Sequence, residues 1–317
     1  MRLTKKLGLF AAAAAFTAST AVLAAPTFIN VLTGGTSGVY YPIGVALSQI
    51  YSTGIDGAKT SVQATKASVE NLNLLQAGRG ELAFALGDSV ADAWNGVEDA
   101  GFKTPLKKIR AIAGTYPNYI QIVANADSGI TSLADLKGKR ISVGAPKSGT
   151  ELNARAIFKA AGLTYKDMGA VEFLPYAESV ELIKNRQLDA TLQSSGLGMA
   201  AIRDLASTMK VSFVAIPADV VSKIGNAAYQ PATIPAGTYD GQTADVPTVA
   251  ITNILVSREG VSDDVAYQMT KLMFEHLDRL GNAHSAAKDI KLQTAAKNLP
   301  IPLHPGAERY YKEVGAL

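Results

Sequence analysis

Residues 33–44 read TGGTSGVYYPIG, and this stretch joins a strand-like apolar run to a helix-like run. The apolar residues of the second run have the spacing of one helix face: Ile43, Ala46, Leu47 and Ile50. Backbone N–H groups at the start of a helix have no partner within that helix, so such a turn can hold a negatively charged group. The glycines and Pro42 are also compatible with a plain strand-to-helix turn. This stretch alone leaves both interpretations open.

A second stretch of the same kind, GAPKSGTELNAR, occupies residues 144–155 between a strand-like and a helix-like run. Ser148 and Glu151 have the spacing of a capping box, which is the structural alternative to a ligand site. Ligands of open parallel sheets bind at the carboxyl ends of strands, where both turns lie. The two turns can face each other only across a cleft between two lobes. A dicarboxylate suits that geometry.

Ser68, Asp88 and Ser195 follow three further strand-like runs, and parallel topology would bring them to the same edge of the sheet as the two turns. Each is also a common helix N-cap residue, so capping is the competing role. Tyr40 is expected to line the cleft with its ring, while Tyr41 packs inward. The predicted ligand-binding set is Thr36, Ser37, Gly38, Tyr40, Ser68, Asp88, Ser148, Gly149, Thr150 and Ser195.

The N-terminus has the order of a secretory signal peptide: basic residues, an apolar run to Val22, then small residues. We place cleavage after Ala24; an uncleaved membrane anchor is the alternative. Removing residues 1–24 also removes Arg2, Lys5 and Lys6, which leaves 27 basic and 27 acidic residues. A neutral mature chain argues against nucleic acid as a partner. The sequence therefore predicts a periplasmic protein that is not inserted in the membrane.

The chain contains no cysteine, which excludes disulfides, thiolate metal sites and a cysteine nucleophile. Its three histidines, His276, His284 and His304, have neither metal-ligand spacing nor a nucleophile motif beside them. We therefore expect no enzyme activity, no cofactor and no metal. Recovery of the bound solute unchanged after incubation would test this.

Strand-like and helix-like segments alternate along the chain, which is typical of an α/β protein with parallel sheets covered on both faces. About 290 mature residues exceed one ordinary domain, so two lobes are expected. Two apolar runs at 109–114 and 119–125 are interpreted as strands that cross between the lobes. The predicted division is lobe 1 at 25–125 and 248–317, and lobe 2 at 126–247. A helix is predicted from Ser262 to about Leu280.

Several segments together resemble the TAXI family of solute-binding proteins, the receptors of tripartite ATP-independent periplasmic (TRAP) transporters. The resemblance rests on 33–44, SVENL at 68–72, Asp88, SLADLKGKRISVG at 132–144, SGT at 148–150 and IPLHPGAERYYKEVG at 301–315. It spans nearly the whole mature chain and implies the two-lobed periplasmic binding-protein (Venus flytrap) fold. It also implies a small carboxylate such as glutamate, glutamine or 2-oxoglutarate, and TRAP permease subunits as partners.

The chain departs from the family's pattern at the presumed cleft edge. Leu86 and Gly87 precede Asp88 where the family often has glutamine followed by serine or alanine, and Lys66 stands where glycine is frequent. A dicarboxylate without an amino group would fit Lys66 better, whereas glutamate would use Asp88. A receptor for an ATP-driven importer is the main alternative, and a surface-interaction protein is another. We expect a monomer.

Overall fold

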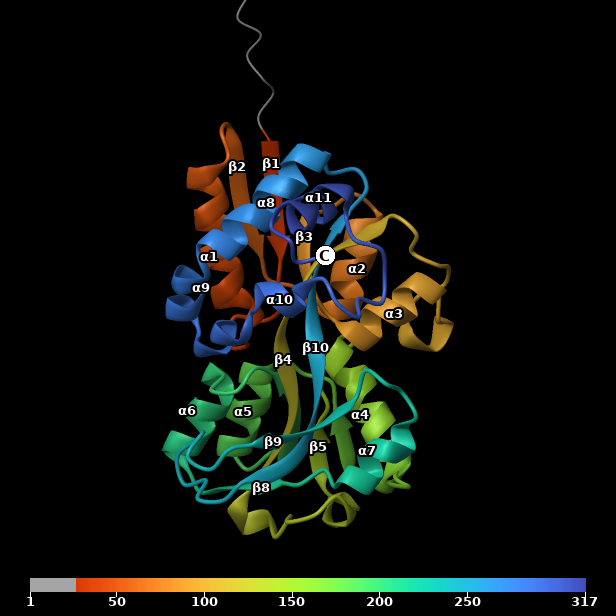
Figure 1. Ribbon diagram of the computed structural model, residues 1–317. Coiled ribbons are helices and arrows are strands. Elements are labelled where there is room, and N and C mark those ends of the chain that lie inside the picture. Colours follow the sequence, from red (N-terminus) through yellow and green to blue (C-terminus); the bar gives the residue numbers. More distant parts are fainter. Residues whose placement is uncertain (1–26) are drawn as a thin grey trace, which may run out of the picture.

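The computed structural model describes residues 27–317. The predicted signal peptide, residues 1–24, lies outside the described residues. Figure 1 shows two bodies, one above the other, with long strands running through both. We call the upper body, which holds β1–β3 and the C-terminus, the first lobe, and the lower body, which holds β5–β9, the second lobe. The residue boundaries predicted between the lobes stay a prediction.

The strands form one ten-stranded sheet in which β2-β1-β3-β10-β4-β7-β5-β6 are neighbours, while β8 pairs with β4 and β9 with β10. Pairing is parallel within each lobe, for β1 with β2 and β3 and for β5 with β6 and β7. The strands are β1 (Thr27–Leu32), β2 (Ala58–Gln63), β3 (Leu82–Leu86), β4 (Ile109–Asn125), β5 (Arg140–Ser142), β6 (Ala170–Glu172), β7 (Ala190–Ser195), β8 (Val211–Val214), β9 (Gln230–Ile234) and β10 (Val246–Arg258).

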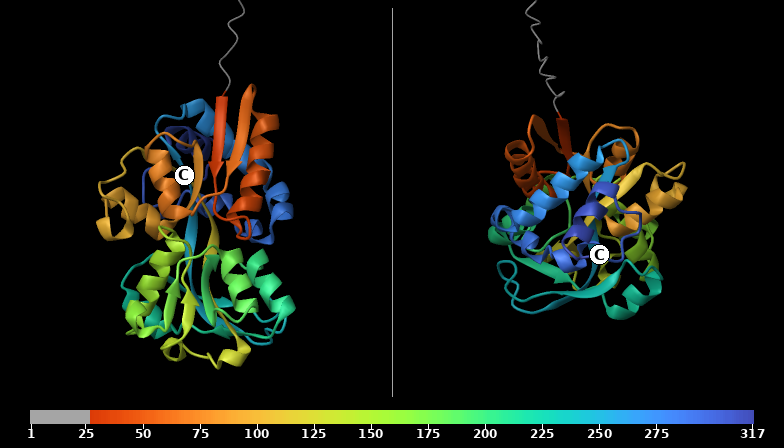
Figure 2. Two further views of the ribbon diagram at one scale, coloured as in Figure 1. Left: turned by 180° about the vertical axis from the view of Figure 1, so that it is seen from behind. Right: turned by 45° about the horizontal axis from the view of Figure 1, so that its top comes forward.

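Helices cover the sheet in both lobes, as the back view in Figure 2 also shows. They are α1 (Tyr40–Gly54), α2 (Ser68–Gln76), α3 (Gly87–Asn95), α4 (Gly149–Ala160), α5 (Tyr176–Lys184), α6 (Ala200–Thr208), α7 (Ala218–Ile224), α8 (Asp263–Glu275), α9 (Leu277–Ala283), α10 (Leu292–Ala295) and α11 (Pro305–Glu313). The single helix predicted from Ser262 is two helices that break at His276. Among residues 27–317, no helix has both the length and the apolar character needed to cross a membrane.

Two long antiparallel strands, β4 and β10, connect the lobes (Figure 1). The two apolar runs predicted as separate strands are one strand of 17 residues, because Thr115–Asn118 continue the extended backbone instead of turning. The pairing of β4 with β10 shifts register between Thr252 and Ile254 and again between Leu255 and Val256. Irregular pairing of this kind bends and twists a strand pair. Both shifts lie beside the stretch of β10 that also pairs with β3 of the first lobe.

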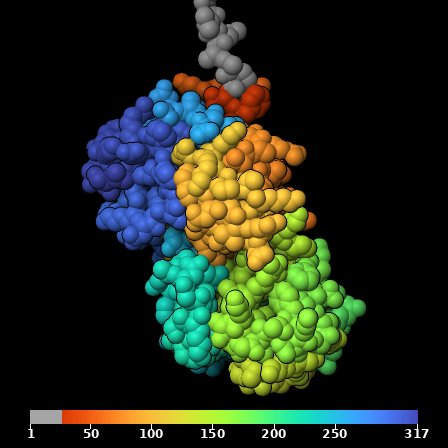
Figure 3. All heavy atoms as spheres, turned by 90° about the vertical axis from the view of Figure 1, so that its right-hand side faces the viewer, coloured from red at the N-terminus to blue at the C-terminus, as the bar shows by residue number. Residues whose placement is uncertain are grey.

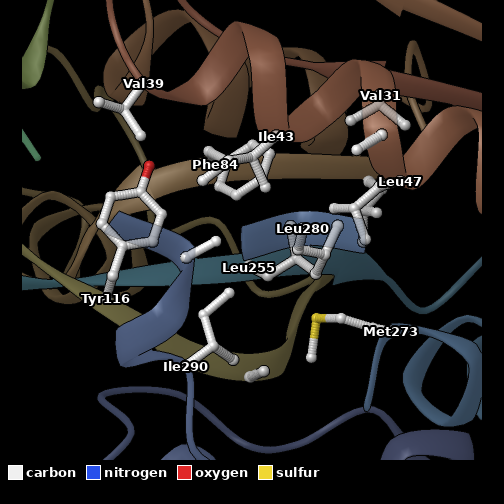
Figure 4. Packing of buried hydrophobic residues seen from close by; sticks show 14 of the residues in the cluster. Val31, Val39, Ile43, Leu47, Phe84, Tyr116, Leu255, Met273, Leu280 and Ile290 are labelled. Carbon is white, nitrogen blue, oxygen red and sulfur yellow. The ribbon is translucent and has the colours of Figure 1, made fainter. Parts of the chain in front are cut away.

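The largest buried cluster lies between α1, the sheet and the C-terminal helices (Figure 4). Ile43 and Leu47 of α1 meet Phe84 of β3 and Leu255 of β10, and Met273 of α8 closes the other side. This is the helix face expected from the spacing in the sequence. Burying each large apolar side chain stabilises the fold by about 1.5–3 kcal/mol, and this burial holds α1 and the turn before it in place. The predicted α/β, two-lobed fold is confirmed by this architecture.

Candidate functional site: an interlobe cavity

A cavity of about 120 Å³ lies between the lobes, next to the helix starts of both. Its wall is made of Gly34, Gly35, Gly38, Val39, Tyr40, Thr65, Lys66, Ala67, Ser68, Leu86, Asn118, Ala145, Ser148, Gly149, Thr150, Pro175, Tyr176, Ser194 and Ser195. In the space-filling view, orange and yellow segments of the first lobe rest directly on green segments of the second (Figure 3). The two lobes are therefore in contact on this side of the molecule.

On the first-lobe side, Tyr40 forms part of the wall with its ring stacked on Phe84, the ring centroids 5.0 Å apart. Its hydroxyl donates to Asn253 Oδ1 at 2.6 Å. Burial raises the pKa of Tyr40, and Tyr176 and Asp88 raise it further, so the hydroxyl stays protonated. Tyr40 thus offers an uncharged aromatic surface to the cavity. Ser68 Oγ accepts from the Leu86 N–H at 3.1 Å, which ties the start of α2 to the end of β3.

On the second-lobe side, Ser148 caps α4 by accepting from the Glu151 N–H at 3.2 Å. Only this half of the predicted capping box is present, because Glu151 Oε1 accepts instead from Arg155 Nε and from the Tyr165 hydroxyl. Thr150 Oγ1 and the Tyr176 hydroxyl lie 2.6 Å apart. The Tyr176 hydroxyl also donates to the Ser194 carbonyl at 2.7 Å. These hydroxyls hold α4, α5 and β7 together behind the cavity wall.

Four helices begin at the cavity wall, two from each lobe. The wall contains the N-cap and first residue of α1 (Val39, Tyr40), α2 (Ala67, Ser68), α4 (Ser148, Gly149) and α5 (Pro175, Tyr176). The first N–H groups of each helix lack an acceptor within the helix, and each start carries a partial positive charge. Of the described residues in the wall, Lys66 alone has a charged side chain. The described wall therefore combines four helix starts with one basic side chain and no acidic one.

The two lobes touch most closely at the start of α4. A Cβ atom placed on Gly149 would lie 2.7 Å from Ser68 Oγ and 2.7 Å from Leu86 Cδ1 of the first lobe. Such distances are too short for any side chain, so glycine permits this approach. Val39 of the first lobe donates its N–H to Ser195 Oγ of the second at 3.3 Å. The contacts describe a closed arrangement of the lobes.

Seven predicted site residues line the cavity: Gly38, Tyr40, Ser68, Ser148, Gly149, Thr150 and Ser195. The other three, Thr36, Ser37 and Asp88, lie outside its wall. Thr36 is exposed, and the Ser37 carbonyl accepts from the Ala201 N–H. The glycines of this turn form the wall in their place.

Asp88 is the third residue outside the wall. It is only 3 % exposed, and its Oδ2 accepts from Asn153 Nδ2 at 2.8 Å and from the Tyr229 hydroxyl at 2.7 Å. Burial raises the pKa of Asp88 to about 6, against the hydrogen bonds from Tyr229, Ser89 and Asn153, which lower it. Its acceptor positions are occupied by protein groups of both lobes.

Sequence reasoning missed several wall residues, of which Tyr176, Asn118 and Ser194 contribute polar atoms. Tyr176 begins a helix soon after β6, so the strand-end rule used for Ser68 would have found it. Asn118 lies in the middle of β4, where no local pattern marks a site. Within residues 27–317, no group of three or more acidic or histidine side chains is placed to hold a metal ion.

Solved structures share this fold at low sequence identity. A structure described as a periplasmic transporter matches with a TM-score of 0.58 at 14% identity, over 91% of this chain and 93% of its own. The binding protein of a phosphonate ABC transporter from Pseudomonas aeruginosa matches with a TM-score of 0.51 at 12% identity, over 84% and 80%. A putative L-cystine ABC transporter protein from Listeria monocytogenes matches with a TM-score of 0.51 at 15% identity, over 84% and 98%.

These similarities show that the solved structures and this protein share a fold. The sequence adds a family match that covers both lobes and all residues of the cavity wall. Residues 31–315 match the family described as NMT1-like, and the chain belongs to that family.

Proposed function

We propose that this protein is an extracytoplasmic receptor that captures a small organic anion between its lobes and delivers it to a membrane transporter. The observation that carries the proposal is the meeting of four helix starts around a cavity whose sole charged side chain, among the described wall residues, is Lys66. Helix starts favour anions at typically 0.3–1 kcal/mol each. Family membership and the transport proteins among the similar structures support a role in solute uptake.

The wall favours a carboxylate without an amino group. An ammonium group is usually paired with a carboxylate, and none belongs to the described wall, since Asp88 is engaged elsewhere. The volume of about 120 Å³ is below the roughly 300–1,000 Å³ of drug-sized ligand sites, so the solute is small. We therefore place 2-oxoglutarate or a similar dicarboxylate ahead of glutamate and glutamine. Tyr40 would cover its carbon chain.

Two transporter classes are candidates. Similar structures whose descriptions name ABC transporters favour an ATP-driven importer. The resemblance of the motifs at 33–44 and 301–315 to TAXI proteins favours a TRAP transporter driven by an ion gradient. Solute uptake into spheroplasts that is restored by added receptor separates them. Sensitivity to vanadate would support the ATP-driven class, and sensitivity to an ionophore would support the TRAP class.

We propose a periplasmic location, in keeping with the predicted signal peptide and with the similar structure described as a periplasmic transporter. Fractionation of the producing cells tests this. The mature chain should appear in the periplasmic fraction and should begin after Ala24. A chain that stays with the membranes and retains residues 1–24 would contradict the proposal.

A thermal-shift screen over dicarboxylates, amino acids and phosphonates tests the solute class, because a ligand raises the melting temperature according to its affinity and concentration. We expect 2-oxoglutarate to give a larger shift than glutamate, and cystine or a phosphonate to give none. Lys66→Met should weaken 2-oxoglutarate binding severalfold and reduce its dependence on salt, because it removes the charge at the wall. Lys59→Met, on the exposed edge strand β2, is the matched control and should bind like the wild type.

A further inference from the structure

Asp88 takes part in a buried hydrogen-bond network that spans the lobes beside the cavity. It belongs to α3 of the first lobe, whereas its partners Asn153 and Tyr229 lie in α4 and before β9 of the second lobe. Asn153 Nδ2 donates to both Asp88 Oδ2 and the Tyr229 hydroxyl, each at 2.8 Å. The Tyr229 hydroxyl donates to Asp88 Oδ2 in turn. All three side chains are buried.

The network continues to the cavity wall in a fixed direction. Because the Asn153 amide nitrogen faces Asp88, its Oδ1 is the atom that accepts from Ser194 Oγ at 2.8 Å. Ser194 Oγ, having donated its proton, accepts from Asn118 Nδ2. Ser194 and Asn118 both line the cavity. Through this series of hydrogen bonds, the Asp88 carboxylate therefore determines which polar atoms of Asn118 and Ser194 remain free at the cavity.

We propose that Asp88 is a positioning residue, which joins the closed lobes through Asn153 and Tyr229 and orients Ser194 and Asn118 toward the solute without touching it. This inference rests on the proposed function for its solute-binding part. Its lobe-joining part stands on contacts between protein groups alone. Hydrogen bonds to a charged group are worth more than neutral ones, so the contact between Tyr229 and ionised Asp88 contributes to holding the lobes together.

Protonation of Asp88 should couple closure to pH. Burial raises its pKa to about 6 in this closed form, while in an open, hydrated cleft the pKa would return toward 3.8. The closed form then binds the proton more tightly, so closure becomes more favourable as pH falls through about 6. The charged and titratable groups around Asp88 are Asp92 on the same helix, Tyr229 and Tyr40. The tyrosine pKa values are raised, so neither tyrosine titrates in this range.

The test compares two tyrosines that each donate to a buried carboxylate. Tyr229→Phe removes the bond to Asp88 across the lobes, and Tyr165→Phe removes the 2.9 Å bond to Glu151 within the second lobe. At pH 7.5 we expect Tyr229→Phe to weaken 2-oxoglutarate binding about tenfold by calorimetry. The radius of gyration of the solute-free protein should also increase by small-angle scattering. Tyr165→Phe should change neither. Equal behaviour of the two variants would overturn the proposal.

A pH series tests the same residue with no loss of a side chain. Wild-type affinity for 2-oxoglutarate should rise about tenfold from pH 7.5 to pH 5.0, which follows from the two pKa values. Asp88→Asn should lose this dependence, and Asp92→Asn, one turn further along α3, should keep most of it, because the Asp92 charge is a smaller cause of the raised Asp88 pKa than burial. A wild-type profile without slope, or one retained in Asp88→Asn, would refute the coupling. If 2-oxoglutarate does not bind the wild type, the solute assignment fails, and the scattering comparison still decides whether Asp88 joins the lobes.

Discussion

The two glycine-rich turns look alike in sequence and differ in the structure. In the first, at residues 33–44, Thr36 and Ser37 stay outside the cavity wall, and Val39 precedes α1 without a side-chain cap. In the second, Ser148 caps α4 and lies in the wall, and Gly149 touches the opposite lobe. Neither turn places a row of unengaged hydroxyls in the cavity wall. The backbone at the helix starts, more than the hydroxyls of the turns, therefore gives the cavity its character.

The largest expected effect separates the glycines of the two turns. Gly149→Ala should weaken solute binding tenfold or more, because its Cβ would lie 2.7 Å from Ser68 and Leu86 and overpacking costs about 1–3 kcal/mol. Gly38→Ala should have little effect, since the nearest atoms to its Cβ are at 3.6 Å. Titration calorimetry of both variants measures the difference. Equal affinities would mean that the α4 start does not limit closure.

The folding stability of Gly149→Ala serves as the control for this comparison. Gly149 lacks a positive φ and begins a helix, so alanine fits its backbone conformation. The melting temperature of the solute-free variant should be no lower than that of the wild type. A marked loss of stability would show that the added Cβ also destabilises the solute-free protein. It would contradict the prediction that the substitution acts only on lobe closure.

A smaller effect separates the serines of the two turns. Ser148→Ala should lower the free energy of unfolding by about 1 kcal/mol, because it removes the cap of α4. Ser37→Ala should leave stability unchanged, since Ser37 accepts from the Ala201 N–H through its backbone carbonyl, which alanine keeps. Urea denaturation of both variants gives the two values. A loss for Ser37→Ala as large as that for Ser148→Ala would break the contrast between the turns.

The smallest effect concerns a third turn at the cavity, the start of α2. Ala67 has φ 69° and ψ −143°, a conformation that favours glycine. Ala67→Gly should raise the free energy of unfolding by up to about 1 kcal/mol, because relief of strain exceeds the extra flexibility of glycine in the unfolded chain. Urea denaturation measures the change. Ala64→Gly, three residues earlier and without a positive φ, is the control, and a similar gain there would contradict the role of strain.

The candidate site could be predicted only in part from the sequence. Gly38, Ser148 and Gly149 were found because strand-to-helix turns are local signals. Tyr40 followed from its place at a helix start. Asp88 was found for the same reason, yet its carboxylate is engaged by Asn153 and Tyr229, which are 65 and 141 residues away. No local pattern reports partners at such separations.

Local sequence patterns alone established the alternation of strands and helices and the helix face of α1. These follow from side-chain period and capping preferences, which act over a few residues. The tertiary structure decided that β4 continues through Asn118, that four helix starts meet, and that Asp88 faces the other lobe. Those outcomes depend on how two lobes close about β4 and β10, and closure is set by packing between segments distant in the chain.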